Sequence, residues 1–375
     1  MARKRSSPRD DSNMLTALSL ARRGLGIVWP NPAVGCVIVR EDQQGRIVGR
    51  GWTQPSGRPH AETEALKRAG HLAKGGTAYV SLEPCSHYGE TGPCTEALID
   101  AGIRRVVVAA SDPDPRVSGS GIARLRDAGL DVLTDVCREE GTLLNRGFFL
   151  RITQGRPLIT LKMATSLDGK IATHLRDSRW ISGPESRAHA HRLRAEHDAV
   201  LIGSETAIAD DPELTCRLPG LEPHTPIRIV LDSRLRIDPE SKLVQSAWVF
   251  PLWIVTTAGQ DQDALEVLQK AGAEVIELPP AANGRPDIGD VVKTLAARGL
   301  TRVLVEGGGG VAGSFIEAGL VDDIVWFRAP KLIGGDGIPA LAAIGTERVA
   351  DAPAFILVDT FKAGDDLMET YRLRS

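Results

Sequence analysis

Near the start of the chain, four residues combine types and spacing that suit metal-assisted hydrolysis. His60, Cys85 and Cys94 are nitrogen and sulfur donors of the kind that zinc prefers, and Glu62 adds a carboxylate two residues beyond the histidine. A catalytic zinc site has three protein ligands and leaves one position for water, whose pKa the metal lowers toward neutrality. The pattern predicts a hydrolytic zinc centre with these three ligands, in which Glu62 moves protons.

A closed structural zinc site is the main alternative. Such sites normally have four protein ligands, and His87 would be the fourth, since no further cysteine stands at ligand spacing. Each residue taken alone could also have no role in metal binding or catalysis. Lone histidines are usually surface or core residues, and cysteines often pack as small apolar side chains. Glu62 favours the catalytic interpretation, because a structural site has no use for a positioned acid.

The spacing of the two cysteines narrows the choice of family. Zinc deaminases carry H-x-E and P-C-x-x-C, and residues 60–62 read HAE, but eight residues separate Cys85 from Cys94. This longer loop resembles the bifunctional riboflavin-biosynthesis deaminase/reductase family, which carries H-A-E and P-C-S-H-x-G-x-T-x-P-C. Residues 31–37, NPAVGCV, are similar to its N-P-x-V-G segment. The resemblance extends from about Asp11 to the C-terminus.

One position departs from that family. Glu90, between the two cysteines, stands where relatives commonly have lysine or arginine, a basic residue well placed to meet a substrate phosphate. A carboxylate at that place repels the phosphate. We expect either that Glu90 points away while Arg58 or Lys74 holds the phosphate, or that the deaminase binds its substrate weakly.

A glycine-rich segment in the second half suits a phosphate. Residues 301–306 predict a strand, 307–310 a loop and 311–318 a helix, so that backbone amides at the helix N-terminus face the loop. Its glycines fit G-x-G-x-x-G, but no acidic residue stands about twenty positions on, where a dinucleotide fold would hold the ribose. The pattern alone therefore leaves a simple tight turn open.

The second half also resembles the reductase half of the same family, which has a dihydrofolate-reductase-like fold and uses NADPH. The resemblance implies cofactor contacts at Ala164, Trp180, Thr206, Asp210, Ser233, Gly308, Gly309, Gly310, Val311, Ala312, Gly313 and Ser314. It implies substrate contacts at Asn31 and His87 in the first half and, in the second, at Lys162, Ser178, Arg194, Leu214, Arg217 and Glu306.

Several of these positions have a chemical reason of their own. Arg194 and Arg217 offer planar guanidinium groups that suit a sugar phosphate. Ser233 with nearby Arg236 is placed to receive the 2′-phosphate that separates NADPH from NADH. The alternatives without ligand binding are that Arg194 lies on a solvated helix and that Ser233 lies in a surface turn. Asp210 is the candidate for assisting protonation in the reductase.

Strands that alternate with helices predict an α/β fold. With the resemblance, we expect a cytidine-deaminase-like αβα sandwich followed by a dihydrofolate-reductase-like α/β domain. His60 must lie at a helix entry to converge with Glu62, because residues two apart on a helix face differently. We expect a loose linker at 281–286. The expected strands are 34–39, 77–81, 105–110, 158–164, 227–231, 252–256 and 301–306, and the expected helices 61–69, 95–101, 122–128, 263–271, 291–297 and 311–318.

Length and composition bound the remaining expectations. The 375 residues allow two domains, and we expect a disordered tail at 1–10, a zinc deaminase domain at 11–153 and an NADPH-dependent reductase domain at 154–375. A net charge of −3 gives no general basic field for nucleic acid. Five cysteines without a secretory leader favour a reducing cytoplasm, and no apolar run is long enough to span a membrane.

Together these features predict a cytoplasmic, homo-oligomeric enzyme that holds Zn²⁺ and NADPH and acts on a small pyrimidine ribosyl phosphate. By resemblance, it deaminates 2,5-diamino-6-ribosylamino-4(3H)-pyrimidinone 5′-phosphate and then reduces the ribosyl group to ribityl. Two alternatives remain: a zinc nucleoside or tRNA deaminase fused to an unrelated domain, and a non-catalytic zinc-stabilised nucleotide-binding protein. The first alternative does not require the glycine-rich reductase half, and the second does not require the positioned acid Glu62.

Overall fold

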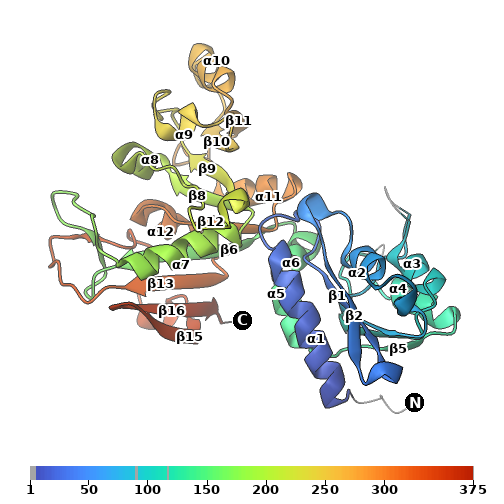
Figure 1. Cartoon of the computed structure of the whole chain (residues 1–375). Helices are drawn as coiled ribbons and strands as arrows, with labels where there is room; N and C mark the ends of the chain where they lie inside the picture. The colour runs from blue at the N-terminus through green and yellow to red at the C-terminus, as the bar shows by residue number, and fades with distance from the viewer. Residues whose placement is uncertain (1–5, 89–91, 116–117, 375) are drawn as a thin grey trace. The chain divides into compact units, whose positions relative to one another are not determined.

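The computed structural model describes residues 6–88, 92–115 and 118–374. The chain divides into two compact units, Met1–Gly155 and Arg156–Ser375, each with its own principal sheet (Figure 1). The division falls two residues beyond the expected boundary at 153. Both units are α/β structures, which agrees with the fold class expected from the sequence.

Unit 1 is a three-layer sandwich around a five-stranded sheet with the order β2-β1-β3-β4-β5. The first three strands of that order are antiparallel to their neighbours, and the last three are parallel. The strands are β1 Gly35–Arg40, β2 Arg46–Trp52, β3 Thr77–Leu82, β4 Arg105–Ala110 and β5 Asp131–Leu133. The helices are α1 Pro8–Ala21, α2 Ala61–Ala69, α3 Cys94–Asp100, α4 Ser120–Asp127, α5 Arg138–Leu144 and α6 Arg146–Gln154.

The two faces of this sheet are covered by different helices because side chains alternate along each strand. On β1, Val37 and Val39 pack in one core cluster with residues of α1 and α5. Cys36 and Ile38 pack in the other cluster with residues of α2, α3 and α4. The predicted metal ligands lie on the face covered by α2 and α3, because His60 precedes α2 and Cys94 begins α3.

The first helix begins inside the segment expected to be a disordered tail. α1 starts at Pro8, and Ser7 caps it in a capping box with Asp10. Asp10 is buried, accepts a hydrogen bond from the Tyr79 hydroxyl at 3.0 Å and binds Arg105 through both guanidinium nitrogens. The expectation of a disordered tail at 1–10 was therefore wrong for residues 8–10, and residues 1–5 lie outside the described part of the chain.

Unit 2 contains a nine-stranded sheet with the order β11-β10-β9-β8-β12-β6-β13-β16-β15. Neighbours from β11 to β13 are parallel, and β16 and β15 complete it as an antiparallel edge. The strands are β6 Leu158–Thr165, β8 Ala199–Gly203, β9 Ile227–Leu231, β10 Leu252–Thr257, β11 Glu274–Leu278, β12 Arg302–Val305, β13 Asp323–Arg328, β15 Phe355–Ala363 and β16 Asp366–Leu373, with β7 Lys170–Ala172 and β14 Ile338–Pro339 forming a separate pair. The helices are α7 Pro184–Ala195, α8 Ser204–Asp210, α9 Lys242–Gln245, α10 Gln262–Lys270, α11 Ile288–Ala297 and α12 Gly309–Glu317.

The central pair of parallel strands brings two helix starts together. β8 and β12 are neighbours, with Leu201 opposite Val305. Each strand leads into a helix at its carboxyl end, α8 after β8 and α12 after β12. Ligands of open α/β sheets bind at the carboxyl ends of the strands, so this edge is where a cofactor is expected.

The segment expected as a loose linker is an ordered turn. Pro280 pairs with Pro286, the Ala281 amide donates to the carbonyl oxygen of Arg285 at 2.8 Å, and the Gly284 amide donates to that of Ala281 at 2.9 Å. The expectation at 281–286 was wrong, because three backbone contacts close the segment between β11 and α11.

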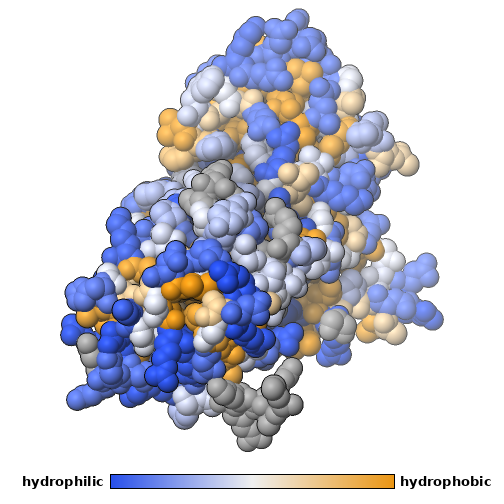
Figure 2. Space-filling view, turned by 90° about the vertical axis from the view of Figure 1, so that its right-hand side faces the viewer, coloured by the Kyte–Doolittle hydropathy of each residue, from blue (hydrophilic) through white to orange (hydrophobic). Residues whose placement is uncertain are grey.

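The surface mixes polar and apolar residues. Figure 2 shows hydrophilic residues over much of the face it presents, with apolar residues between them in small groups. Among the described residues, every helix is too short or too polar to cross a lipid bilayer.

Candidate metal centre and cofactor cavity

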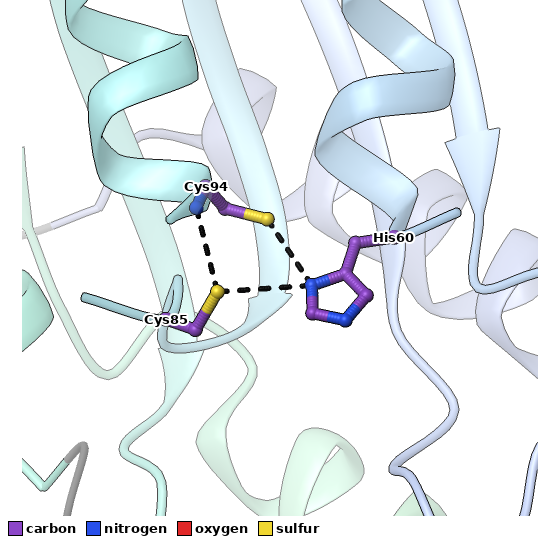
Figure 3. Close-up of side chains that lie close together, drawn as sticks. All are labelled: His60, Cys85 and Cys94. Atoms are coloured by element: carbon purple, nitrogen blue, oxygen red, sulfur yellow. Dashed lines mark hydrogen bonds between the residues drawn. The ribbon is translucent and has the colours of Figure 1, made fainter. Parts of the chain in front are cut away.

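The three predicted metal ligands converge in unit 1. The Nδ1 atom of His60 lies 3.3 Å from the Cys94 sulfur and 3.7 Å from the Cys85 sulfur (Figure 3). All three potential ligand atoms lie within 4.8 Å of one another. Nitrogen and thiolate donors at this separation surround a point that a tetrahedral zinc ion fits, because zinc bonds to such atoms at about 2.0–2.3 Å.

Local backbone structure explains why residues far apart in sequence meet. His60 is the extended N-cap of α2, as the sequence predicted. Cys94 is the first residue of α3, and Cys85 lies in the loop after β3. The Thr95 amide donates to the Cys85 carbonyl at 3.2 Å, and the Cys94 amide donates to the Cys85 sulfur at 3.4 Å. Both thiols are thus held by the first turn of α3, where amides and the helix dipole favour negative charge.

The electrostatics suit metal binding by a thiolate. The hydrogen bond with the Cys94 side chain, followed by that with His60, lowers the pKa of Cys85 to about 4. Glu62 is buried, and this burial raises the pKa of its carboxyl group. The Glu62 carboxyl interacts with the Cys94 thiol, so it lies beside the metal position without belonging to the ligand group.

A closed structural zinc site would need a fourth protein ligand, and the part of the chain that the structure describes places none beside the other three. His87 is exposed and does not join the group of His60, Cys85 and Cys94. Glu90 lies outside the described residues. The donor set therefore fits a zinc ion with a position left open.

Asn31, expected to contact substrate, is held beside the turn that leads to His60. A methyl group on Gly57, which has φ +84°, would lie 1.9 Å from the Asn31 side-chain nitrogen, so the two residues are in close contact. The following backbone is also fixed. The Ala33 amide donates to Oδ1 of Asn145, and the Asn145 side-chain amide donates back to the Ala33 carbonyl, both at 2.9 Å.

In unit 2 the structure brings together three of the residues expected to contact substrate. Arg194 donates to both Glu306 carboxylate oxygens, from Nε at 2.6 Å and from Nη2 at 2.9 Å. Lys162 Nζ lies 3.9 Å from the same carboxylate. Burial alone would raise the pKa of Glu306, but Arg194 and then Lys162 lower it to about 2. Burial lowers the pKa of Lys162.

This arrangement differs from the sequence interpretation in one respect. The guanidinium group of Arg194 was expected to be open to a phosphate, yet it is bonded to Glu306 and, through Nη1, to the Thr215 carbonyl at 3.1 Å. Arg217 is exposed and pairs with Glu213.

Two further expected contacts have unequal access to a ligand. The Leu214 side chain is buried in the core, so only its backbone can meet a ligand. Ser178, by contrast, is exposed.

Trp180, expected at the cofactor, is held by partners that the sequence did not indicate. Its ring is two-thirds exposed, and the Arg187 guanidinium lies 4.4 Å from the ring centroid. Lys331 Nζ donates to the Trp180 carbonyl at 2.6 Å. A cation over the face of an exposed indole restrains its orientation.

A cavity of about 670 Å³ opens at the carboxyl edge of β8, β9 and β12. Its lining includes these expected cofactor residues: Thr206, Ser233, Gly308, Gly309, Gly310, Val311 and Ser314. Five other expected cofactor residues are not part of this lining: Ala164, Trp180, Asp210, Ala312 and Gly313. Arg234 and Arg285 line the cavity and were missed, because nothing local in the sequence joins the two loops that carry them.

Family models match both halves of the chain. The cytidine and deoxycytidylate deaminase zinc-binding region matches residues 7–110, and the RibD C-terminal domain matches residues 157–368. The riboflavin biosynthesis protein RibD of Bacillus amyloliquefaciens is 42% identical over 95% of this chain and 94% of its own.

Solved structures agree with these matches. RibD of Acinetobacter baumannii has a TM-score of 0.86 at 34% identity, covering 98% of this chain and 99% of its own. A Thermotoga maritima protein described as a diaminohydroxyphosphoribosylaminopyrimidine deaminase/5-amino-6-(5-phosphoribosylamino)uracil reductase has a TM-score of 0.85 at 31% identity, with the same coverage. The matches favour a two-activity enzyme over a deaminase joined to an unrelated domain. The chain belongs to the RibD family, the bifunctional zinc deaminases and NADPH-using reductases of riboflavin biosynthesis.

Proposed function

We propose that unit 1 removes the 2-amino group of 2,5-diamino-6-ribosylamino-4(3H)-pyrimidinone 5′-phosphate by hydrolysis and that unit 2 reduces the ribosyl group of the product to ribityl. The observation that carries the proposal is the convergence of His60, Cys85 and Cys94 beside the buried Glu62. The two reactions named for the Thermotoga maritima relative support the substrate assignment.

In the deaminase, Glu62 is the proton carrier. A zinc ion bound by His60, Cys85 and Cys94 would make water acidic enough to lose a proton near neutral pH. Burial raises the pKa of the Glu62 carboxyl, so it accepts a proton more readily than an exposed glutamate and can deliver it to the departing ammonia. Asn31, fixed against Gly57, and His87 in the exposed loop are the substrate contacts.

In the reductase, charged side chains of β6, α7 and the residue after β12 orient the substrate. Glu306 is ionised at neutral pH and is neutralised by Arg194 and Lys162, so it presents a fixed acceptor for sugar hydroxyls. The Arg217 pair with Glu213 is exposed, so its guanidinium can exchange partners and meet the substrate phosphate. Ser178 and the Leu214 backbone complete the substrate set.

NADPH bound along Ala164, Trp180, Thr206, Ser233 and the 308–314 segment would supply the hydride for C1′ of the opened ribosyl group. Asp210, at the end of α8, is our candidate for the accompanying proton. Partial burial raises the pKa of its carboxyl group, although Arg179 acts in the opposite direction. A raised pKa leaves a larger fraction of the Asp210 carboxyl groups protonated near neutral pH, so that a proton is present to be donated.

Two further features support our proposals on assembly and location. β15 is the outer strand of its sheet, and Ile356, Leu357 and Val358 are each about half exposed on it. An apolar edge strand suits pairing with a second copy of the chain and supports our proposal of a homo-oligomer, in which Val358→Lys should yield monomers in light-scattering chromatography. All five cysteines are free thiols, which suits the cytoplasm.

One incubation tests the two activities together. Purified protein is mixed with the diamino pyrimidine phosphate, with and without NADPH, and the products are identified by mass. We expect deamination without NADPH and reduction only with it. Residues 156–375 expressed alone should reduce the deaminated compound. A folded, inactive fragment that regains activity when unit 1 is added would contradict this division into domains.

A further inference from the structure

The cofactor cavity has a cationic wall made by two loops. Arg234 and Arg236 follow β9, and Arg285 belongs to the ordered turn between β11 and α11. Arg236 donates from Nη2 to the Ser204 hydroxyl at 2.8 Å, and its Nε lies 4.0 Å from the Asp232 carboxylate. Within the described residues, no comparable partner is recorded for the guanidinium groups of Arg234 and Arg285. Two arginines of this wall are therefore available to a ligand.

Both loops are held in place by contacts of their backbones. The Ser233 carbonyl accepts hydrogen bonds from the Thr257 hydroxyl at 2.9 Å and from the Gln260 side-chain amide at 3.0 Å. The Arg285 carbonyl accepts the Ala281 amide, and the Arg285 amide donates to the Asn283 side chain at 2.9 Å. The side chains of Arg234 and Arg285 are exposed, but the backbone from which each extends is held by these hydrogen bonds.

Two of the three acidic residues of the same lining lie on other elements than the arginines. Glu205 belongs to α8 and Glu317 to α12, the two helices that begin near the glycine-rich loop. The third, Asp287, follows Arg285 by two residues, but it is the N-cap of α11 and its Oδ1 is bonded to the Asp290 amide at 3.1 Å. A dianionic group is thus favoured at the β9 and β11 loops and disfavoured beside the carboxylates of α8 and α12.

NADPH carries a diphosphate and a separate 2′-phosphate, and the cavity offers two kinds of phosphate site. The amides of the glycine-rich loop and the start of α12 suit the diphosphate, which NADPH and NADH share. A 2′-phosphate on the adenosine ribose needs a second site, and guanidinium groups match phosphate oxygens in pairs. A cavity of about 670 Å³ is large enough for the adenosine part of the cofactor.

We propose that Arg234 and Arg285 together bind the 2′-phosphate of NADPH and give this reductase its preference for NADPH over NADH. Arg236 has a structural role instead, because its hydrogen bond to Ser204 connects the loop after β9 to the start of α8. The proposal rests on the family's use of NADPH and assigns the selectivity to a turn that the sequence presents as a linker.

Binding of the oxidised cofactors tests the proposal without turnover. Isothermal titration calorimetry measures the dissociation constants of NADP⁺ and NAD⁺ for the full chain and for Arg234→Ala, Arg285→Ala and the double variant. Each single variant should weaken NADP⁺ binding about 10- to 100-fold, the loss expected for one charge-assisted hydrogen-bonded contact. NAD⁺ binding should change less than about threefold, and retained NAD⁺ binding also reports that the cavity is folded.

A matched control removes one arginine of the same unit away from the cavity. Arg192 is exposed on α7 and pairs with Glu196, so Arg192→Ala should leave both dissociation constants unchanged. Equal losses of NADP⁺ and NAD⁺ in the Arg234 and Arg285 variants would assign these arginines to the diphosphate and overturn the proposal. Unchanged NADP⁺ binding in the double variant would overturn it as well.

The unmodified protein supplies an independent measurement. Because salt screens exposed charges, NADP⁺ affinity should fall more steeply than NAD⁺ affinity between low and high ionic strength. Adenosine 2′,5′-bisphosphate should likewise bind more tightly than adenosine 5′-monophosphate at low salt. Parallel salt dependences for NADP⁺ and NAD⁺ would contradict a cationic 2′-phosphate site.

Discussion

Replacing Arg194 by methionine should destabilise unit 2 far more than the same change at Arg192, two residues away on α7. Arg194 and Glu306 are both largely buried and share two short hydrogen bonds, whereas Arg192 and Glu196 are exposed. Removing one partner of a buried pair costs about 3–5 kcal/mol, and an exposed pair contributes about 0–1 kcal/mol. Lys162 remains 3.9 Å from Glu306, so we expect about 3 kcal/mol for Arg194→Met.

The pKa of Glu306 gives an independent magnitude. A fall from 4.5 to about 2 corresponds to about 3 kcal/mol of stabilisation at neutral pH. Because the pKa is lower in the folded state, this contribution is fully present above the unfolded value of about 4.5 and is lost as the pH falls toward 2. Glu306→Gln should cost more than Arg194→Met, since it leaves Arg194 and Lys162 together without a carboxylate.

Urea unfolding measures these differences. The transition of unit 2 is the one that NADP⁺ shifts to higher urea, because a ligand stabilises the unit that binds it. With an m-value of about 2 kcal/mol per molar, Arg194→Met should lower this midpoint by about 1.5 M and Arg192→Met by less than about 0.5 M. The zinc content of unit 1 should be unchanged. Equal shifts for the two variants, or a smaller cost for Glu306→Gln than for Arg194→Met, would refute the reasoning.

Three further predictions concern unit 1. The Glu62→Gln variant should keep its zinc, measured by atomic absorption, and its deamination rate should fall by about 10²- to 10⁴-fold. The Cys85→Ser variant should lose the metal. Deamination at the wild-type rate by Glu62→Gln would disprove the proton-carrier role. Gly57→Ala should raise the deaminase KM with zinc retained, because the added methyl group would displace Asn31 and its backbone at φ +84° disfavours alanine; an unchanged KM would separate Asn31 from substrate binding. Glu90→Lys should lower the deaminase KM severalfold if the glutamate repels the substrate phosphate and leave it unchanged if Glu90 points away, whereas a higher KM would contradict both expectations.

The metal centre was predictable because its signals are local. His60 and Glu62 are two residues apart, and a helix entry is the one placement that lets them converge. The structure places His60 at the N-cap of α2. The buried strands were also readable as apolar runs, and β8 went unpredicted although Ala199–Gly203 is wholly apolar and buried.

The rest depended on contacts that no local sequence pattern indicates. Arg194 meets Glu306 across 112 residues, so its guanidinium looked free for a phosphate. The edge strand β15 is largely exposed and has no regular alternation of polar and apolar residues. Arg285 looked like part of a linker because the pairing of Pro280 with Pro286 that closes its turn has no local signature. Contacts between particular residues decided each case, and the spacing of residue types along the sequence does not record them.

The double hydrogen bond between Asn145 and Ala33 implies that the metal ligands and the proposed substrate contact, Asn31, need different lengths of chain. The zinc-binding-region match ends at residue 110, and by then the chain has supplied all three metal ligands and Glu62. Asn145 comes after α5, yet it anchors the backbone that follows Asn31. A truncated chain that stops before Asn145 would keep its metal ligands and lose the anchor of the backbone that follows Asn31, so α5 and the start of α6 support the proposed substrate contact in a way that the zinc-binding region alone does not.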